Sequence, residues 1–262
     1  MPSERLGSQI KDASLVKKMD VRHAAADQGG ECVQVTVGAL WCTHYSGSVR
    51  ALKYRRLRYA YRAPAFFADE SLRSGMSVEF LRFDADFETR DVDGSTSALA
   101  ETVDIVYVSC HGTTGNHGYS AILCSSDWLP AAAGTGASRP VVIVFDTCDL
   151  IDLGDPAWRR HWQVPTVGAG LRLLLGFSSP ATVGEATSLR GRAFVENLAR
   201  GDTFVDAWTG AIVRTRYQGT DQAVALAFGD SAQDASSVLR TASLLAMPAP
   251  RASLSPIVVR YP

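Results

Sequence analysis

The sequence lacks the features that mark several large classes of protein. Its 262 residues include 26 basic and 27 acidic side chains, so the formal net charge is −1. Proteins that bind nucleic acids or anionic membranes usually carry a basic excess, and we therefore expect neither kind of partner. No run of about 18 consecutive apolar residues occurs, which argues against a membrane-spanning helix.

The N-terminus and the cysteines lack the marks of a secreted protein. Residues 1–20 are polar and contain no apolar core of the kind found in a secretory signal. Five cysteines stand at positions 32, 42, 110, 124 and 148, an odd and scattered set without a Cys-x-x-Cys pair. Neither a disulfide framework nor a zinc site is therefore expected. We predict a reduced, cytoplasmic protein with a flexible N-terminal arm over residues 1–30.

Two stretches of the chain, here called the pivotal strands, carry the strongest strand pattern: Val103–Gly112 (VDIVYVSCHG) and Val141–Leu150 (VVIVFDTCDL). Each is a run of β-branched and aromatic residues, typical of strands that are buried on both faces of a parallel sheet. The first strand is expected to end at His111, which Gly112 follows, and the second stretch contains Cys148, two residues after Asp146. Functional side chains of parallel sheets gather beyond the carboxyl ends of the strands, so His111 and Cys148 are expected at one edge.

The flanking segments alternate between strand and helix patterns. Further strands are predicted over residues 31–41, 77–83, 121–123, 170–177, 220–228 and 257–261. Helices are predicted over residues 64–74 and 188–199, and from Thr203, where Thr203 and Asp206 resemble a capping box. Pro64 and Gly75 suit the two ends of the first helix. This alternation predicts a single α/β domain over residues 31–262, with a mostly parallel sheet sandwiched by helices in three layers.

The pairing of a cysteine with a histidine predicts thiol chemistry. The thiolate is the nucleophilic form of cysteine, and histidine is its usual base because it titrates near neutral pH. We interpret Cys148 as the candidate nucleophile and His111 as its base, with backbone N–H groups at Gly112 and Cys148 as oxyanion donors. Cys110 should point away from His111, because side chains alternate along a strand, and we interpret it as a core residue. Acyl transfer by a thiol needs no metal or organic cofactor.

Four further side chains are candidates for substrate binding: Asp146, Asp149, His44 and Glu185. Asp146 and Asp149 flank Cys148 and can attract a cationic group. His44 follows a predicted strand and can reach the same edge of the sheet, and Glu185 lies in a loop of small residues after the predicted 170–177 strand. A carboxylate beside a thiol favours the neutral form, so Asp149 is expected to raise the pKa of Cys148.

The motifs SCHG at Ser109–Gly112 and DTC at Asp146–Cys148 resemble those of the caspase-like (clan CD-type) cysteine peptidases. A closer resemblance is to a bacterial family with a caspase-like core, through VGALWCTHYSG (37–47), GLRLLLGF (170–177) and GRAFVENLARGDTFVDAW (191–208). Both resemblances imply a caspase-like fold. The resemblance to the caspase-like peptidases implies His111 as general base and acid, Cys148 as nucleophile and an oxyanion site at Gly112. It also implies that Asp146 helps to bind an arginine or lysine at the substrate's P1 position.

Three functional hypotheses are consistent with these residues. The first is a cysteine-dependent hydrolase or acyl-transfer enzyme, most simply a caspase-like peptidase with a basic P1 preference. The second is a small-molecule tailoring or cyclisation enzyme of a bacterial biosynthetic pathway that uses the same pocket. The third is a catalytically inactive binding module in which Cys148 is only a core residue. The expected partner is a peptide or a small molecule, and the sequence leaves its identity and the oligomeric state open.

Overall fold

The computed structural model describes residues 34–43, 59–83, 102–113, 121–124, 127–130, 140–151, 162, 170–215, 221–249, 251 and 257–260. All of them belong to one unit of the chain, Gln34–Pro262. The N-terminal arm predicted over residues 1–30 lies outside the described residues, and so does His44.

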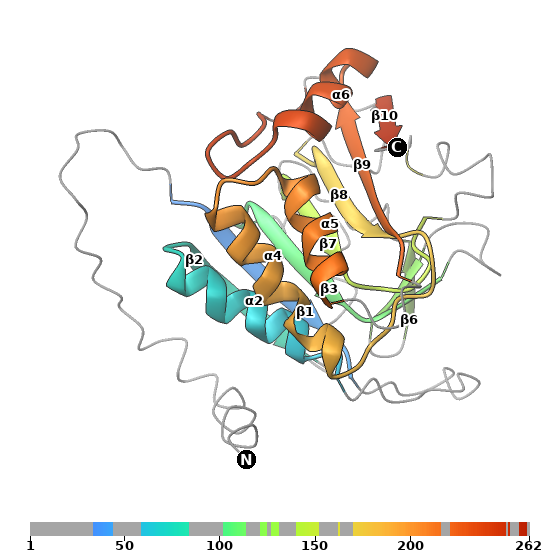
Figure 1. The fold of residues 1–262 in the computed structure, drawn as a ribbon. Coiled ribbons are helices and arrows are strands. Elements are labelled where there is room, and N and C mark those ends of the chain that lie inside the picture. The colour runs from blue at the N-terminus through green and yellow to red at the C-terminus, as the bar shows by residue number, and fades with distance from the viewer. Residues whose placement is uncertain are drawn as a thin grey trace. The chain divides into compact units, whose positions relative to one another are not determined.

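Seven strands form one sheet in the order β10-β9-β8-β7-β3-β1-β2 (Figure 1). They are β1 (Thr36–Trp41), β2 (Ser77–Phe83), β3 (Ile105–Ser109), β7 (Val142–Phe145), β8 (Leu173–Phe177), β9 (Ala223–Gly229) and β10 (Ile257–Arg260). The pairs from β2 to β8 are all parallel, whereas β9 runs antiparallel to both of its neighbours. The predicted α/β class with a mostly parallel sheet is confirmed.

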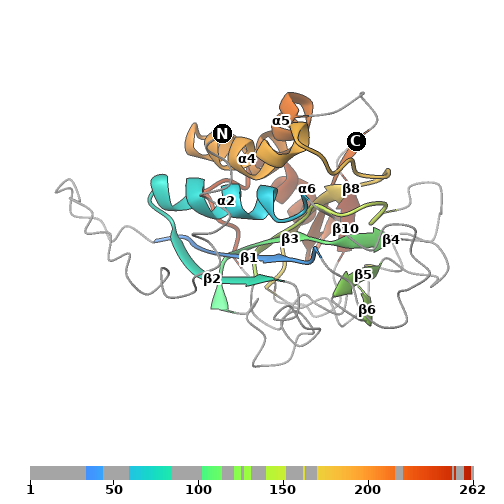
Figure 2. The same cartoon turned by 90° about the horizontal axis from the view of Figure 1, so that it is seen from below.

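Three helices lie side by side across one face of this sheet (Figure 1, Figure 2). They are α2 (Arg62–Arg73), α4 (Arg190–Ala199), which follows the 3-10 turn η7 (Ala186–Leu189), and α5 (Phe204–Thr215). A further helix, α6 (Ala232–Thr241), packs beside β9. Because α2 begins two residues earlier than predicted, Pro64 is its third residue rather than its first. The predicted cap of α5 is confirmed, since the Thr203 hydroxyl accepts the Asp206 N–H at 3.1 Å.

The alternation of side chains along the strands divides the apolar core between the two faces of the sheet. On the helix face, Tyr107 of β3 packs with Phe67, Phe194 and Trp208 from the three helices. The opposite face buries Val108, Phe145 and Cys110 together with Trp162. Full burial of an apolar side chain stabilises the fold by about 1.5–3 kcal/mol, so both clusters hold the pivotal strands firmly in place.

A second, three-stranded antiparallel sheet stands at the carboxyl end of β3 (Figure 2). It consists of β4 (His111–Thr113), β5 (Ala121–Cys124) and β6 (Asp127–Pro130). His111 was predicted as the last residue of the first pivotal strand, and this is wrong: β3 ends at Ser109, and His111 begins β4. The reason is a change of partner, because β1 ends opposite Ser109 and His111 pairs with Leu123 of β5 instead.

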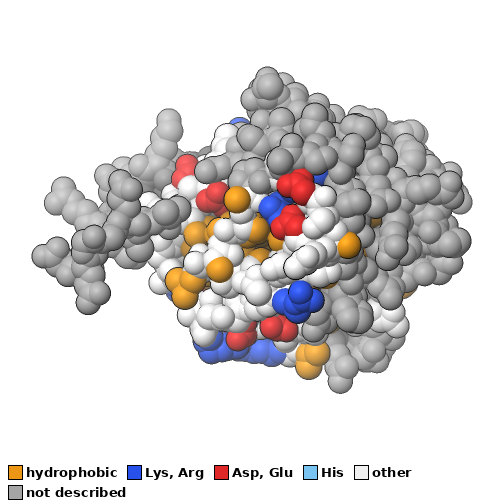
Figure 3. Space-filling model, turned by 90° about the horizontal axis from the view of Figure 1, so that it is seen from above, with side chains coloured by type: hydrophobic (Ala, Val, Ile, Leu, Met, Phe, Trp, Pro, Cys, Tyr) orange, Lys and Arg blue, Asp and Glu red, His pale blue; other side chains and the backbone are white. Residues whose placement is uncertain are grey.

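The surface of the described part mixes charges of both signs. Figure 3 shows acidic and basic side chains next to one another on one face, with apolar side chains between them. This mixture agrees with the near-zero net charge of the chain. Among the helices within the described ranges, none is both long enough and apolar enough to cross a bilayer.

Candidate active site

The two pivotal strands are neighbours and bring the His111 segment against Cys148. Strands β3 and β7 pair in parallel with Val108 opposite Phe145, so the chain leaves both strands at the same edge of the sheet. A side-chain carbon placed on Gly112 would lie only 2.5 Å from the carbonyl oxygen of Cys148. The absence of a side chain at 112 is therefore what allows β4, which begins with His111, to pack directly on the backbone of Cys148.

Cys148 lies in a tight turn of residues 146–149, here called the Cys148 turn, directly after β7. Asp149 in this turn has a φ of +42°, a left-handed conformation that costs a residue with a side chain roughly 1–2 kcal/mol. The Asp149 N–H donates to the Ser179 carbonyl at 3.0 Å, and the Cys148 thiol donates to the Ala181 carbonyl at 3.5 Å. The Cys148 turn is thus held against the residues that follow β8.

The environment of Cys148 favours the neutral thiol. Burial is the main reason that the pKa of Cys148 is raised above its ordinary value of 9.0, and the carboxylates of Asp149, Asp146 and Asp221 raise it further. The effect predicted for Asp149 is therefore confirmed. Any reaction through this sulfur needs a base that removes the thiol proton as the sulfur attacks.

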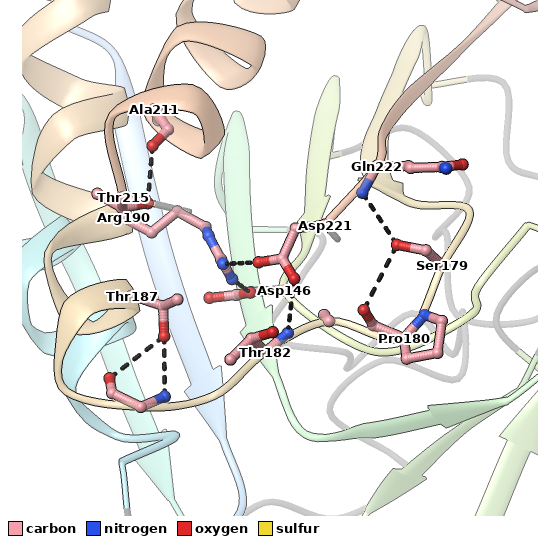
Figure 4. A network of polar contacts seen from close by, with 12 residues as sticks. Asp146, Ser179, Pro180, Thr182, Thr187, Arg190, Ala211, Thr215, Asp221 and Gln222 are labelled. Atoms are coloured by element: carbon pink, nitrogen blue, oxygen red, sulfur yellow. Dashed lines mark hydrogen bonds and ion pairs between the residues drawn. The ribbon is translucent and has the colours of Figure 1, made fainter. Parts of the chain in front are cut away.

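A buried network of ion pairs lies beside the Cys148 turn (Figure 4). Arg190, the first residue of α4, pairs with Asp146 through one terminal nitrogen and with Asp221 through the other, the latter at 2.7 Å. Its guanidinium also lies over the ring of Phe177, 4.8 Å from the centroid. Burial alone would lower the pKa of Arg190, but the attraction of Asp146 and Asp221 outweighs it and the pKa is raised. Arg190 is therefore permanently charged.

Asp146 uses both of its carboxylate oxygens inside the protein. One oxygen accepts from Arg190, and the other accepts from the Tyr107 hydroxyl at 2.9 Å. Burial, together with the charge of Asp146, holds the pKa of Tyr107 well above 10.0, so its hydroxyl stays a donor. With an exposed fraction of 4%, Asp146 has almost no surface open to an incoming group.

Asp221 connects the network to residues 178–182, here called the 178–182 loop. One Asp221 oxygen accepts from Arg190, and the other accepts the Thr182 N–H at 3.0 Å. The hydroxyl of Ser179 accepts the N–H of Gln222 at 2.9 Å (Figure 4). The 178–182 loop is therefore fixed on one side by Asp221 and Gln222 and on the other side by the Cys148 turn.

The remaining predicted residues occupy different places. Asp149 is half-buried beside the thiol, whereas Glu185 is exposed where η7 begins. The oxyanion role of Gly112 stays a prediction, and so does the role of His44, which is not among the described residues. Within the described ranges, no three His, Cys, Asp or Glu side chains are placed to share a metal ion.

Sequence reasoning missed the ion-pair network of Tyr107, Arg190 and Asp221. An arginine and an aspartate are usually surface residues, and the two stand 31 positions apart in the chain. The available signal was local: Arg190 sits in a helix in which three of the next four residues, Gly191, Ala193 and Phe194, lack charge and are buried.

Fold and site together define an α/β protein with a thiol and a histidine segment at the carboxyl edge of a parallel sheet, beside buried ion pairs. The chain belongs to the family described as "Domain of unknown function (DUF6345)", whose model matches residues 56–239.

Two caspases are among the solved structures that are similar to this chain. Caspase-1 from Spodoptera frugiperda is 12% identical with a TM-score of 0.41, over 90% of this chain and 94% of that one. The Drosophila initiator caspase Dronc is 10% identical with a TM-score of 0.39, over 77% of this chain and 87% of that one. No curated protein matches the chain. The side chains of the candidate site are therefore the basis for assigning an activity.

Proposed function

We propose that this protein is a cysteine-dependent hydrolase or acyl-transfer enzyme with Cys148 as nucleophile and His111 as base. One observation carries the proposal: β4 packs on the Cys148 turn so closely that a side-chain carbon at Gly112 would lie 2.5 Å from the Cys148 carbonyl oxygen. This contact supports the proposal because Gly112 directly follows His111, so the backbone of the His111 segment lies against the Cys148 turn. The resemblance of SCHG and DTC to caspase-like peptidases points to a peptide bond as the bond that is cleaved.

The raised pKa of Cys148 determines the order of proton transfers. Because the resting nucleophile is a neutral thiol, His111 acts as a general base that takes the Sγ proton while sulfur bonds to the substrate carbonyl carbon. His111 then returns this proton to the leaving nitrogen as the C–N bond breaks, which leaves a thioester on Cys148. In the second half of the reaction His111 takes a proton from water, and the water oxygen attacks the thioester carbon. The C–S bond then breaks, and His111 returns this proton to the sulfur of Cys148. Backbone N–H groups at Gly112 and Cys148 are the proposed donors to the oxyanion.

A preference for a basic P1 residue is part of this proposal, but we assign it to Asp149 and Glu185 rather than to Asp146. Both oxygens of Asp146 are engaged by Arg190 and Tyr107. Glu185 is exposed and Asp149 is half-buried, so a cationic side chain of a substrate can approach either of them at lower cost in desolvation.

The test is hydrolysis of a fluorogenic peptide library that varies at P1, with wild type, Cys148→Ala, His111→Ala and Cys110→Ala. Cys110 is the matched control, because it is a cysteine next to His111 that is buried in the opposite core cluster. We expect no turnover by Cys148→Ala, a loss of about 10²–10⁴-fold in His111→Ala, and activity in Cys110→Ala. Turnover by folded Cys148→Ala would refute the proposal.

A binding module without catalysis is the second candidate, and the raised pKa of Cys148 supports it. It predicts slow alkylation of Cys148 near neutral pH, at the same rate in wild type and His111→Ala. A Cys148 that reacts fast and depends on His111, yet cleaves no peptide, would instead indicate acyl transfer to or from a small molecule by the same two residues.

A further inference from the structure

We infer that Arg190 and Asp221 are a positioning pair for the thiol: together they fix the 178–182 loop against the Cys148 turn and set the buried charge beside Sγ. The inference deepens the proposed function and rests on it in one respect, namely that Cys148 is the reacting group. Neither residue touches the sulfur in the structure, so neither is a catalytic residue.

Two short paths connect Arg190 to the thiol. The first passes through Asp146, which pairs with Arg190 and precedes Cys148 by two residues in the same turn. The second passes through Asp221, which pairs with Arg190 at 2.7 Å and holds the N–H of Thr182 at 3.0 Å. Thr182 follows Ala181, whose carbonyl oxygen accepts a hydrogen bond from the Cys148 thiol. Arg190 therefore restrains both segments that meet at the sulfur.

The balance of charge in this network is uneven. Two carboxylates share one guanidinium, and the side chains of Arg190, Asp146 and Asp221 are all at most 4% exposed. Water screens such charges poorly, and each of them acts strongly on a neighbouring thiol. The charged groups that act on Cys148 are Asp146 and Asp149 from its own turn and Asp221 from the segment before β9. Arg190 from α4 and Tyr107 from β3 contact these carboxylates, and His111 begins the strand β4 that packs on the turn.

This imbalance allows a positioning role to be separated from a merely structural one. Arg190→Gln and Asp221→Asn both break the same ion pair, and both are expected to lower the stability of the fold. Their effects on the thiol have opposite signs, however. Asp221→Asn removes a negative charge that disfavours the thiolate, whereas Arg190→Gln removes the positive charge that compensates Asp146 and Asp221. A purely structural pair gives no reason for opposite signs.

The experiment measures the rate of iodoacetamide alkylation of Cys148 by mass spectrometry in the folded, full-length chain, from about pH 6 to pH 10. We expect the pH profile of Asp221→Asn to shift toward acid and that of Arg190→Gln toward base, each by about one pH unit, a tenfold change in rate on the slope. Arg190→Lys, which keeps the charge, should stay near wild type. Arg172→Gln is the matched control, a buried arginine remote from the thiol, and should leave the profile unchanged.

Shifts of the same sign in the two pair variants, or an equal shift in Arg172→Gln, would overturn the inference. If Arg190→Gln does not fold, Asp221→Asn decides alone: its amide oxygen can still accept the Thr182 N–H, and an unmoved profile would count against the pair. Peptide turnover is not needed for this measurement. Opposite shifts without peptide cleavage would uphold the pair and reject the proposed peptidase activity. Peptide cleavage without opposite shifts would uphold the peptidase activity and reject the pair.

Discussion

Two buried arginines stand at opposite ends of β8, and they are satisfied in different ways. Arg172, directly before the strand, donates to the carbonyl oxygens of Phe228, at 3.0 Å, and Ala249. It also pairs with Asp234, whose side chain is 38% exposed. Arg190, beyond the other end of the strand, instead faces two carboxylates that are closed off from solvent.

This difference separates two uses of the same side chain. Carbonyl groups carry no net charge and Asp234 is open to water, so Arg172 joins the sheet to the C-terminal segments without concentrating charge. The burial of Arg190 together with its two carboxylates costs several kcal/mol of desolvation before their attraction offsets it. This cost falls at the end of the sheet that holds Cys148, where the carboxylates raise the pKa of the thiol.

The largest expected effect comes from removing each arginine in turn. Arg190→Met leaves Asp146 and Asp221 buried without a counter-ion and should lower the free energy of unfolding by about 3–5 kcal/mol. Arg172→Met leaves two carbonyls and a solvated carboxylate, for which we expect a loss of about 1–3 kcal/mol. Urea unfolding of both variants gives the two values directly. Equal losses would show that the two ends of β8 do not differ as described.

A glycine pair tests the backbone of the thiol end rather than its charge. A methyl group at Gly112 would lie 2.5 Å from the Cys148 carbonyl oxygen and 2.8 Å from the Thr147 hydroxyl oxygen, whereas at Gly184 it would meet nothing within 4 Å. Gly112→Ala should therefore cost about 1–3 kcal/mol, and Gly184→Ala should stay within about 0.5 kcal/mol of wild type. Thermal or urea unfolding measures both. A harmless Gly112→Ala would contradict the close packing of β4 on the Cys148 turn.

The pH dependence of stability gives a smaller effect of defined sign. The pKa of Cys148 is raised in the folded state, so above an ordinary value near 9.0 the unfolded chain loses this proton first. The contribution of the Cys148 thiol to the free energy of unfolding is therefore complete below that pH. It decreases as the pH rises, by at most about 1.4 kcal/mol per pH unit. We expect wild type to lose stability between about pH 9 and pH 10 more steeply than Cys148→Ala does. Identical slopes in urea unfolding would indicate an unshifted thiol.

The smallest expected effect on stability comes from Asp149→Gly. Glycine relieves the left-handed backbone, worth about 1–2 kcal/mol, but adds about 0.5–1 kcal/mol of unfolded-state entropy, so a net gain of about 0.5 kcal/mol is expected. Loss of the carboxylate also lowers the pKa of Cys148 and speeds its alkylation at neutral pH. Asp149→Asn, which keeps the backbone preference but not the charge, should speed alkylation without the gain in stability.

Local patterns were sufficient to predict most of the fold. The apolar runs around Val106 and Val144 are buried strands, as expected. Both faces of such a strand are covered, so apolar residues are needed at every position. The end of β3 was misplaced because His111 pairs with Leu123 of β5 rather than with a strand of the large sheet, and an apolar run does not show where the chain changes its pairing partner. Helix α6 was overlooked although it has a local signal: the Ser231 hydroxyl accepts the Asp234 N–H at 3.1 Å.

The candidate site was only partly predictable, because its polar contacts join residues that lie far apart in the sequence. Spacing after strands suffices to nominate His111 and Cys148, since parallel strands end at a common edge. The partners of Asp146 could not be predicted, because Arg190 lies 44 positions away and Tyr107 lies 39 positions away. A charged residue looks the same in a sequence whether water or another charge satisfies it, so Asp146 was assigned to substrate rather than to Arg190.

The contact at Gly112 also has a consequence for how this family can diverge. Every other amino acid brings a Cβ atom, and that atom meets the Thr147 side chain and, closest of all, the Cys148 carbonyl oxygen, a backbone atom that no second mutation can remove. Compensation is therefore blocked, and only glycine is expected to survive at this position in any lineage that keeps the β4 contact. Gly184, in the same part of the molecule, is expected to drift freely. In a family tree, the branch on which the glycine at position 112 is replaced would then mark where the proposed His111–Cys148 arrangement was lost.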